Sequence, residues 1–363
     1  MSIIFSFIII AVSVYIMRKC SSSFDVASSF LTRNLGEGIK GPTINAIASS
    51  LPELLISSMF LFYFKDVQGF AAGFATIIGS SAFNIAVIPV FSFLYVYSYN
   101  RNKVFEINRS IIKQDVVFLL ISIIILLLGL VIGINLYFAL ILISFYSIYI
   151  YFLIKKRYKI KDNQGVNNSV FYNKKETFIA SFLNLNLFNL FFRGKVNKIS
   201  SIIVILFSVF IIGFSCYFLV IATEKISDIL NVNVFFTAFI IAAIASSVPD
   251  TILSIQDAKN NKFSDSFSNA FGSNIFDICI GIGLPVLIYS IIYQPIDANL
   301  PIKRIGFIGD FLLNGNLFLW SLLLLFLFTS VVSFIYYKYS LKLYTAIQIL
   351  FLYLVFIIAL ILF

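Results

Sequence analysis

The sequence predicts an all-α polytopic membrane protein with ten transmembrane helices, arranged as two inverted five-helix repeats that contain broken helices. Its 363 residues are 60% hydrophobic and 12% charged, with a mean hydropathy of +1.01. A soluble protein of this length could not bury so much apolar surface. Many segments also exceed the run of about 18 apolar residues that marks a membrane span.

The apolar segments define ten spans and three regions. The longest hydrophilic interruption, residues 155–200, separates a first five-helix repeat in residues 1–154 from a second in residues 201–363. The predicted spans are 1–17, 40–64, 68–98, 116–134, 136–154, 201–223, 234–258, 266–292, 316–337 and 343–363.

The basic residues predict the orientation of these spans. All but four of the 26 lysines and arginines fall in the loops after spans 1, 3, 5, 7 and 9, and the exceptions are Lys65, Lys225, Lys303 and Arg304. Cytoplasmic loops carry this excess of basic residues. We therefore expect an outside N-terminus on a retained first helix and a cytoplasmic loop 155–200. The net charge of +10 is then an orientation signal and indicates no nucleic-acid partner.

The residue types exclude several chemistries. The chain has no histidine, so histidine-ligated metals, haem and Ser-His triads are excluded. Its three scattered cysteines form no CxxC pair and indicate neither a zinc site nor a disulfide framework. Any metal site must therefore use oxygen ligands, and we expect no cofactor and no enzyme activity.

Two short motifs occur twice. Residues 48–53 read Ala-Ser-Ser-Leu-Pro-Glu and residues 245–250 read Ala-Ser-Ser-Val-Pro-Asp, with an offset of 197 between their prolines. Residues 79–84 (Gly-Ser-Ser-Ala-Phe-Asn) recur as 272–277 (Gly-Ser-Asn-Ile-Phe-Asp) at an offset of 193. Five spans per half is an odd number, so the second half enters the membrane in the opposite orientation. Similar halves with this property form an inverted repeat, as in many secondary transporters.

Three acidic residues lie deep within the predicted spans. Of the sixteen acids, all but Glu53, Asp250 and Asp277 lie in loops or at span ends. Intramembrane acids are costly and usually functional, and no intramembrane lysine or arginine is available to pair with them. Hydroxyls and an amide share their helical faces at i,i+3 or i,i+4 spacing: Ser49, Ser50, Ser80, Asn84, Ser246, Ser247 and Ser273.

The prolines of the first motif predict breaks in two helices. Pro52 and Pro249 cannot donate to the carbonyls of Ala48 and Ala245, and their rings crowd those carbonyls. Main-chain carbonyls freed in a membrane are tolerated only where they line a cavity or bind something. Matched broken helices in two halves indicate a transport site. An all-oxygen site with three carboxylates favours calcium, and the neighbouring hydroxyls and carbonyls suit sodium or potassium.

These motifs resemble the two alpha-repeats of the calcium/cation antiporter superfamily, the sodium/calcium exchangers. The resemblance covers about 38–95 and 234–290. The second repeat, through Ser268–Asp277 and Gly281–Pro285, is most similar to potassium-dependent sodium/calcium exchangers, and Thr76–Asn84 agrees. There are departures: Ala-Ser-Ser replaces the usual Gly-Thr-Ser, and Ser81 stands where many members have Asn. We expect these departures to affect the coupling ion more than the fold.

The resemblance implies alternating access, with calcium moved against sodium and with potassium as an additional ion. Glu53 and Asp250 would be the main calcium ligands, and Asn84 and Asp277 would complete the centre. Flanking sodium sites would use the remaining oxygens: Ser49, Ser50, Ser80, Ser246, Ser247, Ser273 and the carbonyls near Ala46 and Ala243. Asp277 stands where potassium-dependent members place an acid.

Three other functions compete with this interpretation. A proton/divalent-cation antiporter could use the same carboxylates, although the hydroxyls favour sodium. A cation channel would more usually have rings from several subunits. Gly306–Asp310, which reads Gly-Phe-Ile-Gly-Asp, resembles the Gly-x-Gly-Asp pattern of intramembrane aspartyl proteases, but the spacing is wrong and Asp310 lies in a predicted external loop. We expect inorganic cations and the lipid bilayer as partners, no obligatory protein partner, and a location in the cytoplasmic membrane of a cell.

Overall fold

The computed structural model describes residues 2–31, 46–99, 109–158, 177–261, 263–293 and 317–362. Within these ranges the regular elements are all helices. Nine helical stretches in the described residues are long and apolar enough to cross a membrane, two of them composed of consecutive shorter elements, Val234–Lys259 and Phe263–Ile292. The shorter apolar helix Leu51–Phe64 completes the ten predicted spans. The predicted fold class is therefore confirmed.

The first half forms five spans. Its helices are α1 (Ile3–Leu31), α2 (Ala46–Ser49), α3 (Leu51–Phe64), α4 (Val67–Tyr99), α5 (Arg109–Ile132) and α6 (Leu136–Tyr158). Two short helices, α7 (Phe178–Leu183) and α8 (Leu187–Phe192), follow in the central loop.

The second half repeats this order with additional π-helical turns. Its helices are α9 (Lys198–Leu230), α10 (Val234–Thr237), η3 (Ala238–Ala242), α11 (Ala243–Ser246), α12 (Val248–Lys259), α13 (Phe263–Phe276), η4 (Asp277–Ile282), α14 (Gly283–Ile292), α16 (Leu317–Lys338) and α17 (Leu343–Ile361). The π-helices η3 and η4 adjoin the second copies of the two motifs, and such turns are frequent at functional sites.

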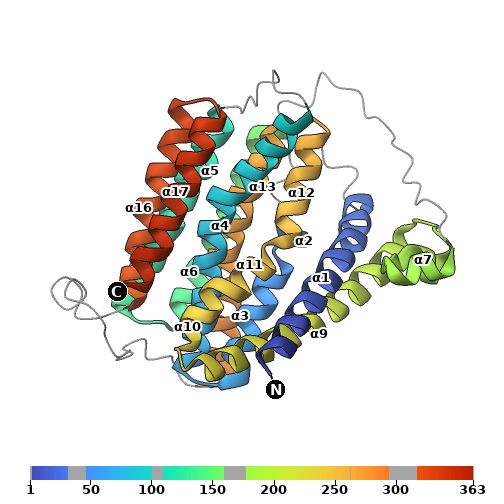
Figure 1. Cartoon of the computed structure of the whole chain (residues 1–363), viewed down its shortest axis with the longest axis horizontal. Helices are drawn as coiled ribbons and strands as arrows, with labels where there is room; N and C mark the ends of the chain where they lie inside the picture. The colour runs from blue at the N-terminus through green and yellow to red at the C-terminus, as the bar shows by residue number, and fades with distance from the viewer. Residues whose placement is uncertain are drawn as a thin grey trace.

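The first span of each half is longer than predicted. Helix α1 continues to Leu31, not residue 17, and α9 covers 33 residues in place of 201–223. A helix of 33 residues extends about 50 Å, which exceeds the thickness of the hydrocarbon core, so α9 must tilt or continue beyond the core. Figure 1 shows α1 and α9 side by side and oblique to the steeper helices α4 and α13. The apolar run located each span but did not find its ends, because polar residues continue the helices.

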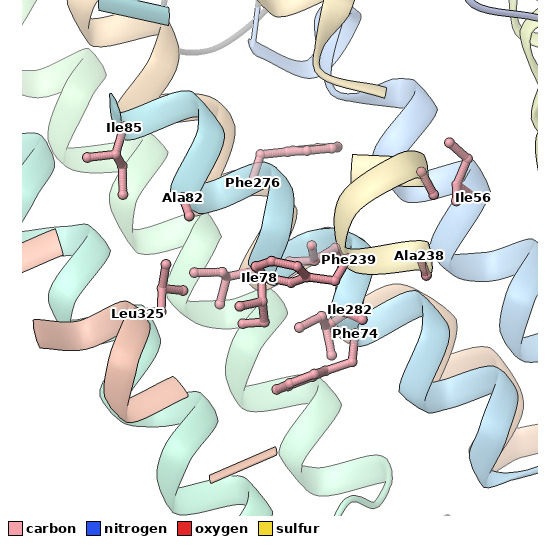
Figure 2. Packing of buried hydrophobic residues seen from close by; sticks show 14 of the residues in the cluster. Ile56, Phe74, Ile78, Ala82, Ile85, Ala238, Phe239, Phe276, Ile282 and Leu325 are labelled. Carbon is pink, nitrogen blue, oxygen red and sulfur yellow. The ribbon is translucent and has the colours of Figure 1, made fainter. Parts of the chain in front are cut away.

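Helix α4 is the centre of the molecule. Its most apolar window is 89% buried, compared with 28% for the corresponding windows of α1 and α17, whose exposed apolar side chains suit contact with lipid. Figure 2 shows Phe74, Ile78 and Ala82 of α4 in the core with Phe239 of η3 and Ile282 of η4. The two halves therefore interlock around α4, which carries one of the repeated motifs.

A glycine allows the closest crossing of the halves. A Cβ atom added to Gly79 would collide with the carbonyl oxygen of Phe239 and would lie 2.7 Å from the Cβ of Ala243. Only a hydrogen at this position lets the backbone of α4 approach η3 and α11 so closely. The same contact brings the motif on α4 beside the broken helix of the other half.

Candidate functional site

Both proline motifs interrupt their helices at equivalent residues. Helix α2 ends at Ser49 and α3 begins at Leu51, with Ser50 between them at φ −89° and ψ 5°. Helix α11 ends at Ser246 and α12 begins at Val248, with Ser247 at φ −77° and ψ −1°. Pro52 and Pro249 occupy the first turn after each break, where a missing N–H is best tolerated.

The backbone before each break is bonded in the same way. The carbonyl of Ala46 accepts from the Ser50 N–H at 2.9 Å and the Ser49 hydroxyl at 3.4 Å. The carbonyl of Ala243 accepts from the Ser247 N–H at 3.1 Å and from the Ser246 hydroxyl at 3.1 Å. Each of the two carbonyls predicted to lie near sodium sites thus accepts two hydrogen bonds, one from a backbone N–H and one from a hydroxyl. A cation bound at either carbonyl would displace the hydroxyl, which can rotate away.

Glu53 lies beside a pair of hydroxyls that joins the two halves. The Ser80 and Ser247 hydroxyl oxygens are 2.9 Å apart, and each hydroxyl lies within hydrogen-bonding distance of Glu53 Oε1, at 3.4 and 3.5 Å respectively. All three side chains are completely buried. One carboxylate from α3 therefore contacts α4 and the break of the opposite half.

Asp250 is the corresponding acid on α12. The Ser273 hydroxyl donates to Asp250 Oδ1 at 3.0 Å, and the Asn84 amide nitrogen lies 3.4 Å from Oδ2. The same amide nitrogen lies 3.4 Å from the Ser80 hydroxyl, which connects Asp250 to the Glu53 cluster. The structure thus brings both copies of both motifs into one buried polar network.

Several oxygens in this region have no hydrogen-bond partner in the protein. They are Glu53 Oε2, Asn84 Oδ1, Ser50 Oγ and both carboxylate oxygens of Asp277. Buried polar atoms without partners are costly and need an explanation. No lysine or arginine in the described part of the chain is buried, so no basic side chain neutralises these carboxylates. Cation coordination would satisfy both requirements.

The carboxylates do not form a compact cluster by themselves. Within the described residues, no group of three or more Asp, Glu, Cys or His side chains is placed to hold a metal ion. Asp277, at the first residue of η4, is completely buried but outside the hydrogen-bond network. In this conformation of the protein, a bound cation would therefore be coordinated by hydroxyl, amide and carbonyl oxygens together with the carboxylates. The ligand roles assigned from the sequence stay predictions.

Sequence reasoning missed two buried polar residues. Asn274 accepts from the Asn84 amide at 3.0 Å and donates to the carbonyl of Ser81 at 3.0 Å. It lies inside the repeated motif, but within this copy only the i,i+4 pair Ser273 and Asp277 was selected from the sequence.

Asp115 is the second missed residue. We expected it at the edge of a span, but it is completely buried in α5. It accepts from the Ser268 hydroxyl at 2.6 Å and the Tyr149 hydroxyl at 3.3 Å. These bonds join α5, α6 and α13. Hydropathy alone could not distinguish a buried acid at a helix end from an exposed one.

The segment Gly306–Asp310, which resembles a protease pattern in the sequence, lies outside the described residues.

Matched broken helices, an interlocked pair of halves and buried oxygen ligands define a class of protein, the secondary transporters. The comparison with known families is specific within that class. The sequence matches the family described as sodium/calcium exchanger protein over residues 2–155 and 200–362. The chain belongs to this family, which confirms the resemblance drawn from its motifs. The family is one of transporters.

Similar curated proteins are sodium/potassium/calcium exchangers, over short segments. Sodium/potassium/calcium exchanger 2 of Gallus gallus is 30% identical over 90 residues, which cover 24% of this chain and 14% of that protein. Sodium/potassium/calcium exchanger Nckx30C of Drosophila melanogaster is 40% identical over 58 residues, 16% of this chain and 7% of that protein. The matched part is thus a small fraction of each relative's length.

Solved structures share the fold over nearly the whole chain. The H+/Ca2+ exchanger CAX aligns with a TM-score of 0.63 at 17% identity, covering 99% of this chain and 90% of that one. The sodium-calcium exchanger NCX_Mj, soaked with Na+ and Ca2+, aligns with a TM-score of 0.56 at 18% identity and covers 98% of both chains. At these identities the likeness establishes the fold alone, and the protein is an integral multi-pass membrane protein with that fold.

Proposed function

We propose that this protein is a secondary active antiporter that exchanges Na+ for Ca2+ by alternating access. The observation that carries the proposal is the network of Glu53 and Asp250 with both helix breaks, completely buried and without a buried basic side chain in the described residues. Two carboxylates that lack a protein counter-charge favour a divalent cation. Family membership and the sodium/potassium/calcium exchangers among its relatives support calcium as the transported ion.

The proposed division of labour follows the sequence predictions. Glu53, Asp250, Asn84 and Asp277 bind calcium as substrate, and the hydroxyls and carbonyls at the two breaks bind sodium. Asp277 is the candidate for a potassium requirement, because its two carboxylate oxygens have no hydrogen-bond partner and remain available to a cation. No cofactor, enzyme activity or obligatory protein partner is part of this proposal.

A proton-coupled exchange is the second candidate. Its support is the fold similarity to the H+/Ca2+ exchanger CAX, which has the higher TM-score of the two structures compared above. Against it stands the hydroxyl set at the two breaks. Hydroxyls and main-chain carbonyls serve as ligands for sodium, whereas a proton carrier requires only the carboxylates.

Ion flux in reconstituted liposomes distinguishes these candidates. Vesicles loaded with sodium are diluted into sodium-free buffer containing radioactive calcium, with or without potassium, and uptake is compared with that driven by a proton gradient. Sodium-driven uptake supports the proposal, and its potassium response tests the role of Asp277. Uptake that follows only the proton gradient would establish the second candidate. Calcium flux that needs neither gradient would instead indicate a channel.

We also propose that residues 1–154 and 201–363 are the two repeats in a cytoplasmic membrane, with the N-terminus outside and loop 155–200 cytoplasmic. The three cysteines, Cys20, Cys216 and Cys279, are all buried. A single cysteine introduced at the exposed residue Asn260, between α12 and α13, should therefore react selectively with an impermeant thiol reagent. Reaction only after the cytoplasmic face is opened supports this orientation, and reaction in intact cells would reverse it.

A further inference from the structure

The side-chain amide of Asn274 has only one possible orientation. Its nitrogen lies 3.0 Å from the carbonyl oxygen of Ser81, and its oxygen lies 3.0 Å from the amide nitrogen of Asn84. A main-chain carbonyl can only accept a hydrogen bond. The nitrogen of Asn274 must therefore face Ser81, and its oxygen must face Asn84. Both asparagines are completely buried, so water does not compete for these bonds.

The orientation of Asn274 fixes that of Asn84. An amide oxygen cannot donate, so Asn84 must direct its NH2 group at Asn274. Its own oxygen, Oδ1, then points elsewhere and has no partner in the protein. Rotating the Asn84 amide by half a turn would oppose two oxygens 3.0 Å apart. The other contacts of the Asn84 nitrogen, to Asp250 and Ser80, are longer at 3.4 Å, and both partners belong to the proposed ion site.

The two repeats differ at these positions in a way that explains the need for an orienting residue. The offset of 193 pairs Asn84 with Asp277 and pairs Ser81 with Asn274. A carboxylate offers an oxygen in either orientation, but an amide offers an oxygen in one and a repelling NH2 group in the other. In the first repeat the ligand position holds an amide, Asn84, and it is this amide that Asn274 of the second repeat contacts.

We propose that Asn274 is a positioning residue that holds Asn84 with its oxygen toward the transported cation. The proposal rests on the proposed function, because it assigns Asn84 Oδ1 as a calcium ligand. Asn274 itself does not contact the ion in this arrangement.

A double-mutant cycle tests this role in reconstituted, monodisperse protein. Asn274→Ala should weaken the apparent calcium affinity for sodium-driven uptake at least tenfold. In an Asn84→Asp background a carboxylate offers an oxygen in either orientation, so the same change should cost no affinity and should also remove the oxygen of Asn274 that faces the new carboxylate. Equal losses in both backgrounds would show a merely structural role and overturn the proposal.

Two further measurements keep the result interpretable. If Asn274→Ala elutes as aggregate, Asn274→Thr replaces it, because a hydroxyl both donates and accepts and does not dictate the orientation of Asn84. The expected losses are the same. Absence of calcium flux in the unmodified protein would remove the proposed function itself, whereas wild-type affinity in Asn274→Ala would remove only the positioning role.

A second surface carries an independent inference. The short helix α7 exposes Phe178, Ile179, Phe182 and Leu183 by 74, 73, 62 and 60%. Helix α7 is attached to the transmembrane part of the protein, because the Tyr15 hydroxyl of α1 donates a hydrogen bond to the Leu183 carbonyl at 2.8 Å. Figure 1 shows α7 beside α1 and the beginning of α9, far from α16 and α17.

This apolar face continues the lipid-facing surface of the protein. On the following helix, α8, the centroid of the Phe191 ring lies 5.1 Å from that of Phe207, which belongs to the span α9, and both side chains are exposed. Arg193, Lys195 and Lys198 are exposed just beyond α8, where basic residues attract anionic headgroups. We infer that α7 and α8 lie in the membrane interface, with the apolar face of α7 in contact with lipid.

Fluorescence quenching tests this surface on the full chain. Phe182→Cys carries an environment-sensitive dye in vesicles of phosphatidylcholine and phosphatidylglycerol, and Asn260→Cys, in an exposed turn between spans, is the matched control. Lipids with a nitroxide near the top of the acyl chain should quench the dye at 182 several-fold more than at 260. Equal quenching at both positions would show that water or protein covers α7 and would overturn the inference.

Discussion

Neutralising Glu53 should weaken calcium binding by a large and calculable factor. Glu53→Gln keeps the shape of the side chain and an oxygen for Ser80 and Ser247, but removes one negative charge from a completely buried position. At a calcium–oxygen separation of about 2.4 Å, that charge contributes about 3.5 kcal/mol even with the dielectric constant of bulk water. This is about 300-fold in affinity, and a buried site should show no smaller loss.

The assay is the calcium dependence of sodium-driven uptake in liposomes, supported by calcium protection against thermal unfolding in detergent. Asp228→Asn is the matched control, because it removes the same charge from an exposed residue paired with Lys225 and should leave the affinity within twofold. A Glu53→Gln protein that is folded and has wild-type calcium affinity would refute the assignment of Glu53 as a ligand.

Three further substitutions test the structure around the site. Asp115→Asn should lower the free energy of unfolding by about 1.5–3 kcal/mol, because it removes a charge-assisted hydrogen bond. Thermal melting measures this loss, and the calcium affinity should be retained. A tenfold loss of calcium affinity would contradict the placement of Asp115 outside the ion site. Gly79→Ala should reduce uptake more than tenfold by forcing α4 from Phe239, whereas Gly213→Ala, with no atom nearer than 3.9 Å, should not. Pro249→Ala restores an N–H and should close the helix break, so uptake should fall; unchanged rates would show that the break needs no proline.

Much of the fold followed from sequence because the membrane restricts it. A bilayer requires long apolar helices with satisfied backbones, so hydropathy located ten spans and the duplicated motifs indicated their inversion. The prolines predicted the two helix breaks, each of which lies two residues before its proline. The positions of the deep acids Glu53, Asp250 and Asp277 also followed, because a charged residue is conspicuous in an apolar segment.

Tertiary structure alone decided which polar groups meet. The pairing of the Ser80 and Ser247 hydroxyls and the hydrogen bond between Asn84 and Asn274 join residues more than 160 positions apart. Their geometry depends on how closely α4 crosses the second half. The burial of Asp115 likewise depends on α6 and α13, which cover it. Local spacing in the sequence determines which side chains share one face of a helix. Only the packing of the helices against each other determines which atoms of other helices those side chains contact.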